Sequence, residues 1–185
     1  PAREGSKRCP EKNWTLYTNK STGIMRPLIE WAVIHATGSK YIDTIAVSSD
    51  SDIILAHAKP PVIPIRRPEH LASDHASSEA VIVHALYSLT SLGEHQIPPH
   101  DLLVLLQPTS PLRLSSDIDA SIELAVNLDR SITSVDPSRR LNGAVYVAHT
   151  HRFLSTLRFS GSEHYVMPQD RSLDIDYMWD FDAKP

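Results

Sequence analysis

The sequence contains a single cysteine, Cys9, and this scarcity excludes a disulfide within the chain. It also suits a reducing compartment, because domains stapled by disulfides are typical of oxidising ones. No apolar run approaches the length of a membrane span, and no signal peptide is visible. We therefore expect a soluble cytoplasmic protein, or a nuclear one if the source is eukaryotic, that has no membrane partner.

Basic residues are not in excess, since 18 Lys and Arg stand against 22 Asp and Glu, for a net charge of -4. A general nucleic-acid binder needs a basic face for phosphates, so we expect no nucleic-acid partner. The ten histidines include no HExxH or paired Cys/His spacing, which argues against zinc. Repeats and low-complexity tracts are absent too, and 185 residues with 41% hydrophobic content predict one globular domain over residues 1–185.

Strand-like and helix-like patterns alternate along the chain. The expected strands are 44–50, 102–106, 131–135 and 143–148, and the expected helices are 27–37, 75–89 and 115–128. We expect Asp74 to cap the second helix and Ser115 or Ser116 to cap the third. The run from Leu102 to Leu106 is apolar throughout, which is typical of a central strand buried on both faces. This order predicts an α/β fold with a mostly parallel sheet.

Polar clusters follow the expected strands, where ligands of such sheets usually bind. Ser48-Ser49-Asp50 follows the first strand, and Gln107-Pro108-Thr109-Ser110 follows the second. A third cluster is the opening segment PAREGSKRCPEKN, residues 1–13. A phosphate loop of this kind normally follows a strand, so we expect that the chain lacks its first strand.

The opening segment combines cations with glycine. Arg3, Lys7 and Lys12 could neutralise a triphosphate, and Gly5 would let the backbone approach it closely. A solvated basic terminus explains the same residues equally well. The segment also lacks the Gly-Lys-Ser/Thr ending of a P-loop.

The segment LQPTSPLR, residues 106–113, places an amide and two hydroxyls in a stiff loop. Gln107 stands at the strand end, and the flanking prolines restrict where Thr109 and Ser110 point. The alternative is a proline-rich turn whose hydroxyls cap the next helix. The residues alone leave both interpretations open.

The segment RRPEHLASDHASS, residues 66–78, joins two arginines to a run of small hydroxyl residues. Arg67 and Ser78 could hold a base or a ribose. Alternatively, Asp74 only caps a helix and the arginines are solvated.

The segment SLDIDYMWDF, residues 172–181, carries two carboxylates two positions apart. If the segment is extended, Asp174 and Asp176 point to the same face, with Asp180 on a following turn. Paired carboxylates repel each other unless a cation lies between them, and Mg²⁺ is the usual cation beside phosphates. The alternative is a charged strand edge that faces water.

Together, these stretches closely resemble the CMP-N-acylneuraminate (CMP-sialic acid) synthetases, the acylneuraminate cytidylyltransferase family. The segment PAREGSKRCPEKN is similar to the family's nucleotide-binding signature. RPEHLASDHASS, LQPTSPLR, NGAVYV and SLDIDYMWDF are similar to later blocks, in the same order along nearly the whole chain. The resemblance implies a Rossmann-like α/β nucleotidyltransferase fold, with a mostly parallel sheet flanked by helices.

The family reaction joins CTP to an acidic nine-carbon sugar, an N-acylneuraminate, to give CMP-sugar and pyrophosphate. The resemblance implies Mg²⁺ as cofactor, CTP and N-acylneuraminate as partners, and a homodimer. The residues it implies to bind nucleotide are Arg3, Ser6, Lys7, Lys12, Asn13, Arg67, Ser78 and Thr109. Gln107 and Tyr146 are implied to contact the sugar, Asp174 and Asp176 the metal, and Arg3, Lys12 and Gln107 are the expected catalytic residues.

The sequence departs from the family pattern in several places. The first strand is missing, residues 14–26 form a longer insert, and PSRR at 137–140 runs almost directly into NGAVYV. In the family, the stretch near residue 140 supplies a sugar contact and much of the dimer arm. The resemblance as a whole still predicts N-acylneuraminate activation as the function. The alternatives are transfer of CMP to another nonulosonic acid, or a truncated or inactive homologue that binds nucleotide or a partner without turnover.

Overall fold

A computed structural model describes residues 11–73, 76–91, 93, 101–159 and 163–182. The helices are α1 (Leu28–Thr37), α2 (Asp52–Leu55), α3 (Ser78–Ser91), α4 (Ser115–Leu128) and α5 (Thr150–Thr156). The strands are β1 (Leu16–Thr18), β2 (Met25–Pro27), β3 (Ala46–Ser49), β4 (Ile63–Arg66), β5 (Leu102–Leu105), β6 (Ile132–Val135), β7 (Leu141–His149) and β8 (Glu163–Val166). Short 3₁₀ turns are η1 (Lys12–Trp14), η2 (Glu69–Leu71), η3 (Gln169–Arg171) and η4 (Met178–Asp182).

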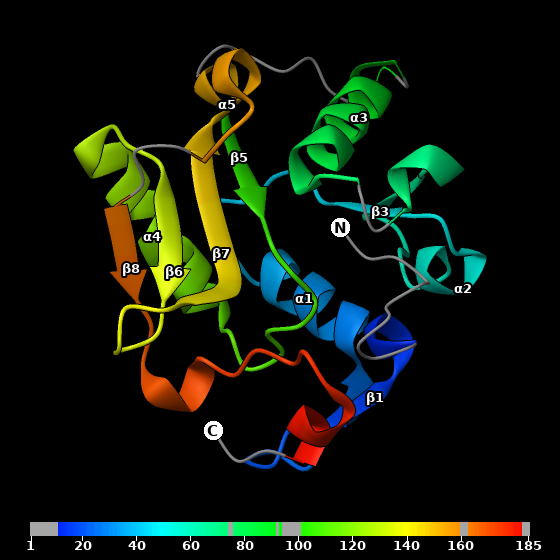
Figure 1. Ribbon diagram of the computed structural model, residues 1–185, viewed down its shortest axis with the longest axis vertical. Coiled ribbons are helices and arrows are strands. Elements are labelled where there is room, and N and C mark those ends of the chain that lie inside the picture. The colour runs from blue at the N-terminus through cyan, green and yellow to red at the C-terminus, as the bar shows by residue number, and fades with distance from the viewer. Residues whose placement is uncertain (1–10, 74–75, 92, 94–100, 160–162, 183–185) are drawn as a thin grey trace.

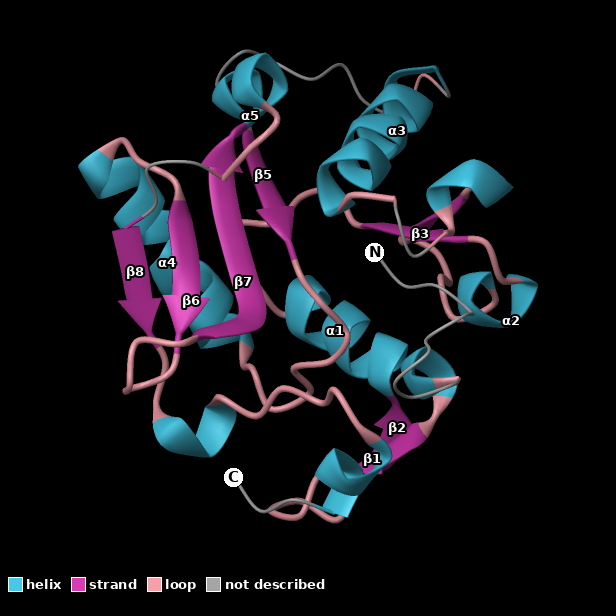
Figure 2. Cartoon of the chain, viewed as in Figure 1, coloured by secondary structure: helices cyan, strands magenta, loops and turns pink. Residues whose placement is uncertain are grey.

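The largest sheet has four strands in the order β5-β7-β6-β8 (Figure 1). In it, β7 runs antiparallel to both β5 and β6, whereas β6 and β8 are parallel. A second sheet pairs β3 with β4 in parallel, and β1 and β2 form an antiparallel hairpin. Helices surround these sheets (Figure 2), so the predicted α/β class is confirmed.

The expected parallel pairing holds for only part of the fold. The connection from β6 to β7 is a tight turn, in which the Asp136 N–H donates to the Arg140 carbonyl at 2.8 Å and the Arg139 N–H donates to the Asp136 carbonyl at 2.9 Å. A connection this short can only reverse the chain, because parallel neighbours need a crossover of a dozen residues or more. The sheets are therefore mixed, and the prediction of a mostly parallel sheet is wrong for the four-stranded one.

The strand β5 is not central in the described part of the chain, which corrects the prediction made from its sequence. It bonds to β7 on one side, and no described strand bonds to its other edge. Leu102, Leu103 and Val104 are consequently half-buried, although the pattern predicted burial on both faces. All three line a cavity that residues of β3 also line.

The helix starts differ from the expected caps. At α4 the Leu114 N–H donates to Oδ2 of Asp117 at 2.9 Å, so the cap comes from within the first turn. The Ser115 hydroxyl donates instead to the carbonyl of His35 in α1 at 2.8 Å, which corrects the prediction that Ser115 or Ser116 caps this helix. At α3 the Ala80 N–H donates to the Ser77 hydroxyl at 3.1 Å, whereas the expected cap, Asp74, lies outside the described residues.

The main core lies between α4 and the four-stranded sheet. Ile118 and Ile122 of α4 pack against Val145 and Val147 of β7, all of them buried. A smaller cluster joins α1 to the segment 173–175 through Leu28, Trp31 and other apolar residues. None of the helices in the described ranges is long and apolar enough to cross a bilayer.

The insert at residues 14–26 forms the β1–β2 hairpin. The Asn19 N–H donates to the Ile24 carbonyl at 2.9 Å, and Gly23 has a φ of +70° in the turn. Tyr17 of β1 is buried against the ring of Phe181 in η4, with ring centroids 6.4 Å apart. The insert thus helps to hold the C-terminal segment that carries the predicted carboxylates.

Candidate active site

Residues from both ends of the described chain meet below the carboxyl end of β5. The Lys12 ammonium donates to the carbonyl of Ile175 at 3.2 Å and lies 3.6 Å from Oδ1 of Asp176. The Ile175 N–H in turn donates to the Thr109 carbonyl at 2.8 Å. Three predicted site segments therefore converge: the end of the basic opening segment, the QPTS loop and the SLDID segment.

The segment 172–176 is not a strand, yet Asp174 and Asp176 both interact with Lys12. Burial raises the pKa of Asp174 above its usual range, the negative charges of Asp176 and Asp180 raise it further, and the Thr109 hydrogen bond and the Lys12 charge oppose the rise. Asp174 Oδ1 is buried without a hydrogen-bond partner in the described structure. An acceptor held in this state is suited to a cation or a donor from a ligand.

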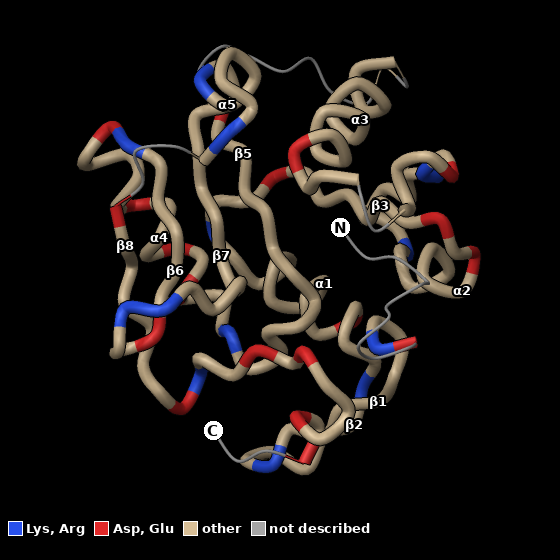
Figure 3. The backbone as a smooth tube through the Cα atoms, viewed as in Figure 1, with Lys and Arg blue, Asp and Glu red and all other residues tan. Residues whose placement is uncertain are grey.

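Acidic positions recur along the segment that crosses the lower end of the sheet (Figure 3). Asp180 Oδ2 accepts the N–H groups of Asp176 at 2.8 Å and Tyr177 at 2.7 Å, so it closes the turn after the carboxylate pair. Within the described residues, no three His, Cys, Asp or Glu side chains form a ready-made metal centre. The Asp174/Asp176 pair thus offers oxygen ligands that a metal would have to share with a bound ligand or water.

Gly143 at the start of β7 makes room for Gln107. Its φ is +68°, and a Cβ at this position would collide with Gln107 Oε1 and lie 3.7 Å from Asp174 Oδ2. The Gln107 amide is therefore held against the β7 backbone, beside the buried carboxylate. A glycine inside an apolar strand pattern is the sequence signal that indicates such a close approach.

Arg113 holds the loop that carries Gln107 and Thr109. Its side chain is fully buried, and Nη1 donates to the carbonyl of Gln107 at 3.2 Å and to that of Ala144. Burial lowers the pKa of Arg113 to about 10, and the nearby charge of Asp117 opposes the shift. Arg113 was not predicted as a site residue because an arginine in a proline-rich loop is normally expected to be exposed to solvent.

Asp117 organises the other side of Arg113. Its carboxylate accepts from Arg171 Nε at 3.0 Å and Nη2 at 2.8 Å, and from the Tyr165 hydroxyl at 3.0 Å. The same carboxylate caps α4, so one buried group ties β8 and η3 to the helix start. This network fixes the chain just before the SLDID segment.

Tyr146 lies in β7 opposite Leu105 of β5, with its ring 5.5 Å from that of Phe159. Burial raises the pKa of Tyr146, and the charge of Asp174 adds to the increase. That Tyr146 contacts the sugar stays a prediction.

Arg67 is held at the carboxyl end of β3. It is only 4% exposed, and Nη2 donates to the Ser48 carbonyl at 2.6 Å while Nε donates to the Ser48 hydroxyl at 3.3 Å. Ser78 is an exposed residue that begins α3, and Asn13 is buried in η1. Three other predicted phosphate ligands, Arg3, Ser6 and Lys7, lie outside the described residues.

Solved structures share this arrangement of strands and helices. A CMP:2-keto-3-deoxy-manno-octonic acid synthetase in complex with CTP matches 96% of this chain and 91% of its own, with a TM-score of 0.65 and 14% identity. A 4-diphosphocytidyl-2C-methyl-D-erythritol synthase matches 91% of this chain and 90% of its own, with a TM-score of 0.63 and 12% identity. The fold is thus the Rossmann-like α/β fold of nucleotidyltransferases.

The sequence itself identifies the group within that class. The family model described as "Cytidylyltransferase" matches residues 1–153. The chain belongs to this cytidylyltransferase family, in agreement with the resemblance found in its motifs.

Curated relatives are similar over different shares of their length. The N-acylneuraminate cytidylyltransferase of Escherichia coli O18:K1:H7 (strain RS218 / NMEC) is 30% identical over 220 residues, covering 98% of this chain and 49% of the relative. The CMP-N,N'-diacetyllegionaminic acid synthase of Legionella pneumophila subsp. pneumophila (strain Philadelphia 1 / ATCC 33152 / DSM 7513) is 34% identical, covering 74% of this chain and 56% of the relative. The pseudaminic acid cytidylyltransferase of Campylobacter jejuni subsp. jejuni serotype O:2 (strain ATCC 700819 / NCTC 11168) is 37% identical, covering 64% of this chain and 47% of the relative. This chain therefore spans about half the length of these relatives.

Proposed function

We propose that this chain transfers CMP from CTP to a nonulosonic acid, with an N-acylneuraminate as the first candidate. The observation that carries the proposal is the convergence of Lys12, Thr109, Asp174 and Asp176 beside Gln107 in a chain of the cytidylyltransferase family. These groups come from segments far apart in sequence, and together they supply a cation, an amide, a hydroxyl and two carboxylates. This set suits transfer of a charged phosphoryl group, where positioning and charge stabilisation dominate.

In the proposed reaction, the anomeric hydroxyl oxygen of the sugar forms a bond to the α-phosphorus of CTP. The bond from that phosphorus to the oxygen bridging to the β-phosphate breaks, pyrophosphate leaves, and the hydroxyl proton passes to solvent or to a basic group of the ligands. Lys12 would hold phosphate oxygens at its position beside Asp176, 3.6 Å away. Gln107, held by Gly143 and Arg113, would orient the reacting sugar oxygen.

Asp174 and Asp176 fit Mg²⁺, because carboxylate oxygens are its preferred protein ligands and Asp174 Oδ1 is buried without a partner in the described structure. Bound there, Mg²⁺ would neutralise charge on the phosphates. Thr109 would then keep Asp174 oriented through its hydrogen bond.

The remaining predicted residues take roles by position. Arg67 and Ser78 would contact the cytidine from the β3–β4 side, and Tyr146 would line the sugar pocket beside Asp174. Asn13, next to Lys12 in η1, would contribute to phosphate binding. Arg3, Ser6 and Lys7 would complete that set, with Arg3 joining Lys12 and Gln107 as catalytic residues.

One of the two alternatives has specific support. Transfer to another nonulosonic acid is favoured by the similar identities of the legionaminic and pseudaminic acid relatives. Nucleotide binding without turnover is the other alternative, and the test below separates it from the proposed reaction.

The test is pyrophosphate release from CTP and Mg²⁺ with N-acetylneuraminic, legionaminic and pseudaminic acids offered separately. We expect release with at least one acid, lost in the Asp174→Ala/Asp176→Ala double variant and retained in Asp170→Asn, an exposed acidic control. CTP that raises the melting temperature without release from any acid would support the binding-only alternative. Absence of both release and CTP binding would contradict the proposal.

A further inference from the structure

The pairing between β6 and β7 is interrupted by a bulge at Ser134. The register of the two strands shifts there, and Ser134 alone lies opposite residues 142–145 of β7. Extra residues in one strand lose their ladder partners and turn the chain, and bulges of this kind are frequent beside active sites. This bulge contains Gly143, whose backbone leaves room for the Gln107 amide. The shape of the bulge therefore decides where that amide lies.

Two side chains hold the bulge in place of ladder hydrogen bonds. The Ser134 hydroxyl accepts the Val145 N–H at 2.8 Å and donates to Oδ1 of Asn142 at 2.6 Å. The same Oδ1 accepts the Ala144 N–H at 3.2 Å. Ser134 and Asn142 are both buried, so the loss of either side chain would leave a buried backbone N–H without its partner.

Asn142 also joins the bulge to the two loops that carry the candidate site. Its carbonyl accepts the Ser110 hydroxyl of the QPTS loop at 3.0 Å. Its Nδ2 donates to the Ser172 hydroxyl, at the start of the SLDID segment, at 3.4 Å and to Sδ of Met167 at 3.3 Å. Two bonds accepted and two donated saturate the carboxamide, so its orientation is fixed.

The residue type at Ser134 is explained by the bulge and not by the core. All four residues of β6 are buried, and a buried strand position favours a β-branched or aromatic side chain. A buried hydroxyl is unfavourable unless it is hydrogen-bonded. Both hydrogen bonds of the Ser134 hydroxyl go to residues of the bulge.

We propose that Ser134 is a positioning residue for Gln107, acting through Asn142 and the bulge. The Ser134 hydroxyl fixes the Asn142 amide, and both groups fix the backbone that follows Gly143. That backbone bounds the space in which Gln107 Oε1 lies. The effect on turnover rests on the proposed function, in which Gln107 orients the reacting sugar oxygen, whereas the position of Gln107 can be measured without turnover.

The test compares Ser134→Ala with Thr133→Val in the full chain. Thr133 is the neighbouring buried residue of β6, and its hydroxyl is paired with Nδ1 of His164 at 3.0 Å instead of with the bulge. In NMR spectra recorded without ligands, we expect the signals of the Gln107 side-chain amide and the Gly143 backbone to shift or broaden in Ser134→Ala. The control should leave them in place. Unchanged signals in Ser134→Ala would overturn the proposal.

Turnover gives a second readout. Ser134→Ala should lower kcat for pyrophosphate release about tenfold and leave the KM for CTP unchanged, because a misplaced orienting group slows the chemical step without weakening nucleotide binding. Equal kcat losses in Ser134→Ala and Thr133→Val would assign the effect to general loosening of β6 and overturn the proposal. If the wild-type chain releases no pyrophosphate, the proposed function fails, while the NMR comparison still decides whether Ser134 positions Gln107.

Further variants separate positioning from stability. Ser134→Cys keeps the volume but replaces the hydroxyl by a weak donor and acceptor, so it should displace the Gln107 signals even if the alanine variant does not fold. Wild-type signals in the cysteine variant would overturn the proposal. Ser134→Thr keeps the hydroxyl and should retain both the signals and turnover. In the Ser134→Ala/Gly143→Ala double variant the losses in kcat should not add, because both changes act on Gln107, and additive losses would overturn this shared route.

Discussion

At the residue scale, the site contains a few residues whose conformation or charge is unfavourable for folding but positions the groups of the site. Gly143 has a left-handed backbone, and Asp174 keeps a carboxylate in a half-buried position. Neither feature stabilises the fold by itself, and such local strain is common at functional sites. Two predictions follow from these two residues.

Gly143→Ala should lower pyrophosphate release about 10²-fold, because the new Cβ would push Gln107 from its place and misplacement by about 1 Å costs this much. The matched control is Gly23→Ala, which has a similar φ of +70° but no atom within 4 Å of the new Cβ. Both variants carry backbone strain of about 1–2 kcal/mol. Gly143→Ala adds the displacement of Gln107, so its melting temperature should fall at least as far as that of Gly23→Ala. An equal loss of turnover in both would contradict a special role for the Gly143–Gln107 contact.

Asp174→Asn should raise the melting temperature while it abolishes turnover. The raised pKa means that the folded state disfavours the ionised carboxylate relative to the unfolded chain, so its ionisation opposes folding at neutral pH. A neutral amide of the same shape removes that cost and also removes the proposed metal ligand. The gain should shrink as the pH falls toward 4 and Asp174 becomes protonated, which thermal melts across pH would show. A loss of stability at pH 7 would show instead that the carboxylate supports the fold.

At the scale of elements, α1 and the start of α4 meet around His35. Its side chain is 8% exposed, its Nε2 has no partner in the described structure, and its ring lies 5.8 Å from that of Trp31. Burial and, to a smaller extent, the positive charge of Arg113 lower the pKa of His35 to about 4, although Asp117 opposes the shift. The joint between the two helices is thus built around a neutral imidazole.

The stability of the chain should consequently fall as the pH drops from about 6.5 to about 4. Over this window the unfolded chain takes up a proton at His35 and the folded chain does not, so the contribution is complete above pH 6.5 and is lost toward pH 4. The loss should reach about 3 kcal/mol, since each pKa unit corresponds to about 1.4 kcal/mol. Urea unfolding at pH 7.5, 6 and 4.5 measures it, with His35→Gln as the comparison. A pH dependence that is unchanged in His35→Gln would assign the effect to other groups.

Secondary structure was predictable where elements are long or strongly apolar. The patterns at 27–37, 75–89, 115–128 and 143–148 correspond to α1, α3, α4 and β7. The four-residue strands β3, β5 and β6 were also predicted, at 44–50, 102–106 and 131–135, whereas β1, β4 and β8 were missed because none of them is a run of apolar residues. The predicted cap of α4 was wrong because the Ser115 hydroxyl donates to the carbonyl of His35, and the Asp117 carboxylate accepts the Leu114 N–H in its place.

The sequence motifs of the site could be predicted, but the spatial arrangement of their side chains could not. The sequence indicated Lys12, Thr109 and Asp174 separately, and the fold brings them together. Arg113 and Asp117 could not be found this way, because their importance comes from burial and from partners far away in the sequence. The carboxylate pair was expected on a strand, whereas hydrogen bonds from Ile175 and to Asp180 place it in a loop.

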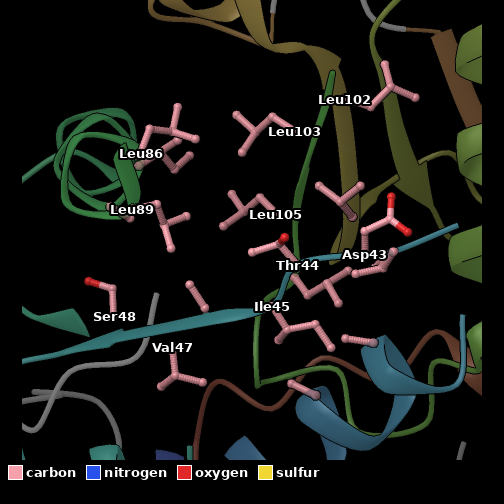
Figure 4. Close-up of a pocket in the computed structure, with 18 of the residues that line it drawn as sticks. Asp43, Thr44, Ile45, Val47, Ser48, Leu86, Leu89, Leu102, Leu103 and Leu105 are labelled. Atoms are coloured by element: carbon pink, nitrogen blue, oxygen red, sulfur yellow. The ribbon is translucent and has the colours of Figure 1, made fainter. Parts of the chain in front are cut away.

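At the scale of the whole molecule, the two main sheets are held together without a hydrogen-bonded strand between them in the described structure. A cavity of about 530 Å³ lies between these sheets, lined by residues of β3, β5 and the helices around them (Figure 4). The part of the chain on the β3–β4 side should therefore separate from the rest at low cost.

Native-state hydrogen exchange should show this separation as two levels of protection. We expect the slowest amides in β6 and β7, whose residues are almost all buried, and faster exchange in β3 and β4. Exchange in β3 and β4 should also depend less on urea than global unfolding does, because a smaller surface is exposed. A single level of protection across both sheets would show that the molecule unfolds as one unit.

The contact between Lys12 and Ile175 also has a consequence for biosynthesis. It joins residues 163 positions apart, so a nascent chain can form the site only after almost all of the described chain has left the ribosome. At about 5–20 residues per second, the basic segment waits roughly ten to thirty seconds for its partner carboxylates. Contacts of such long range also close late during refolding, because the entropy of the intervening loop must be overcome first. Ligand binding is therefore expected to be among the last properties that this protein acquires as it is made.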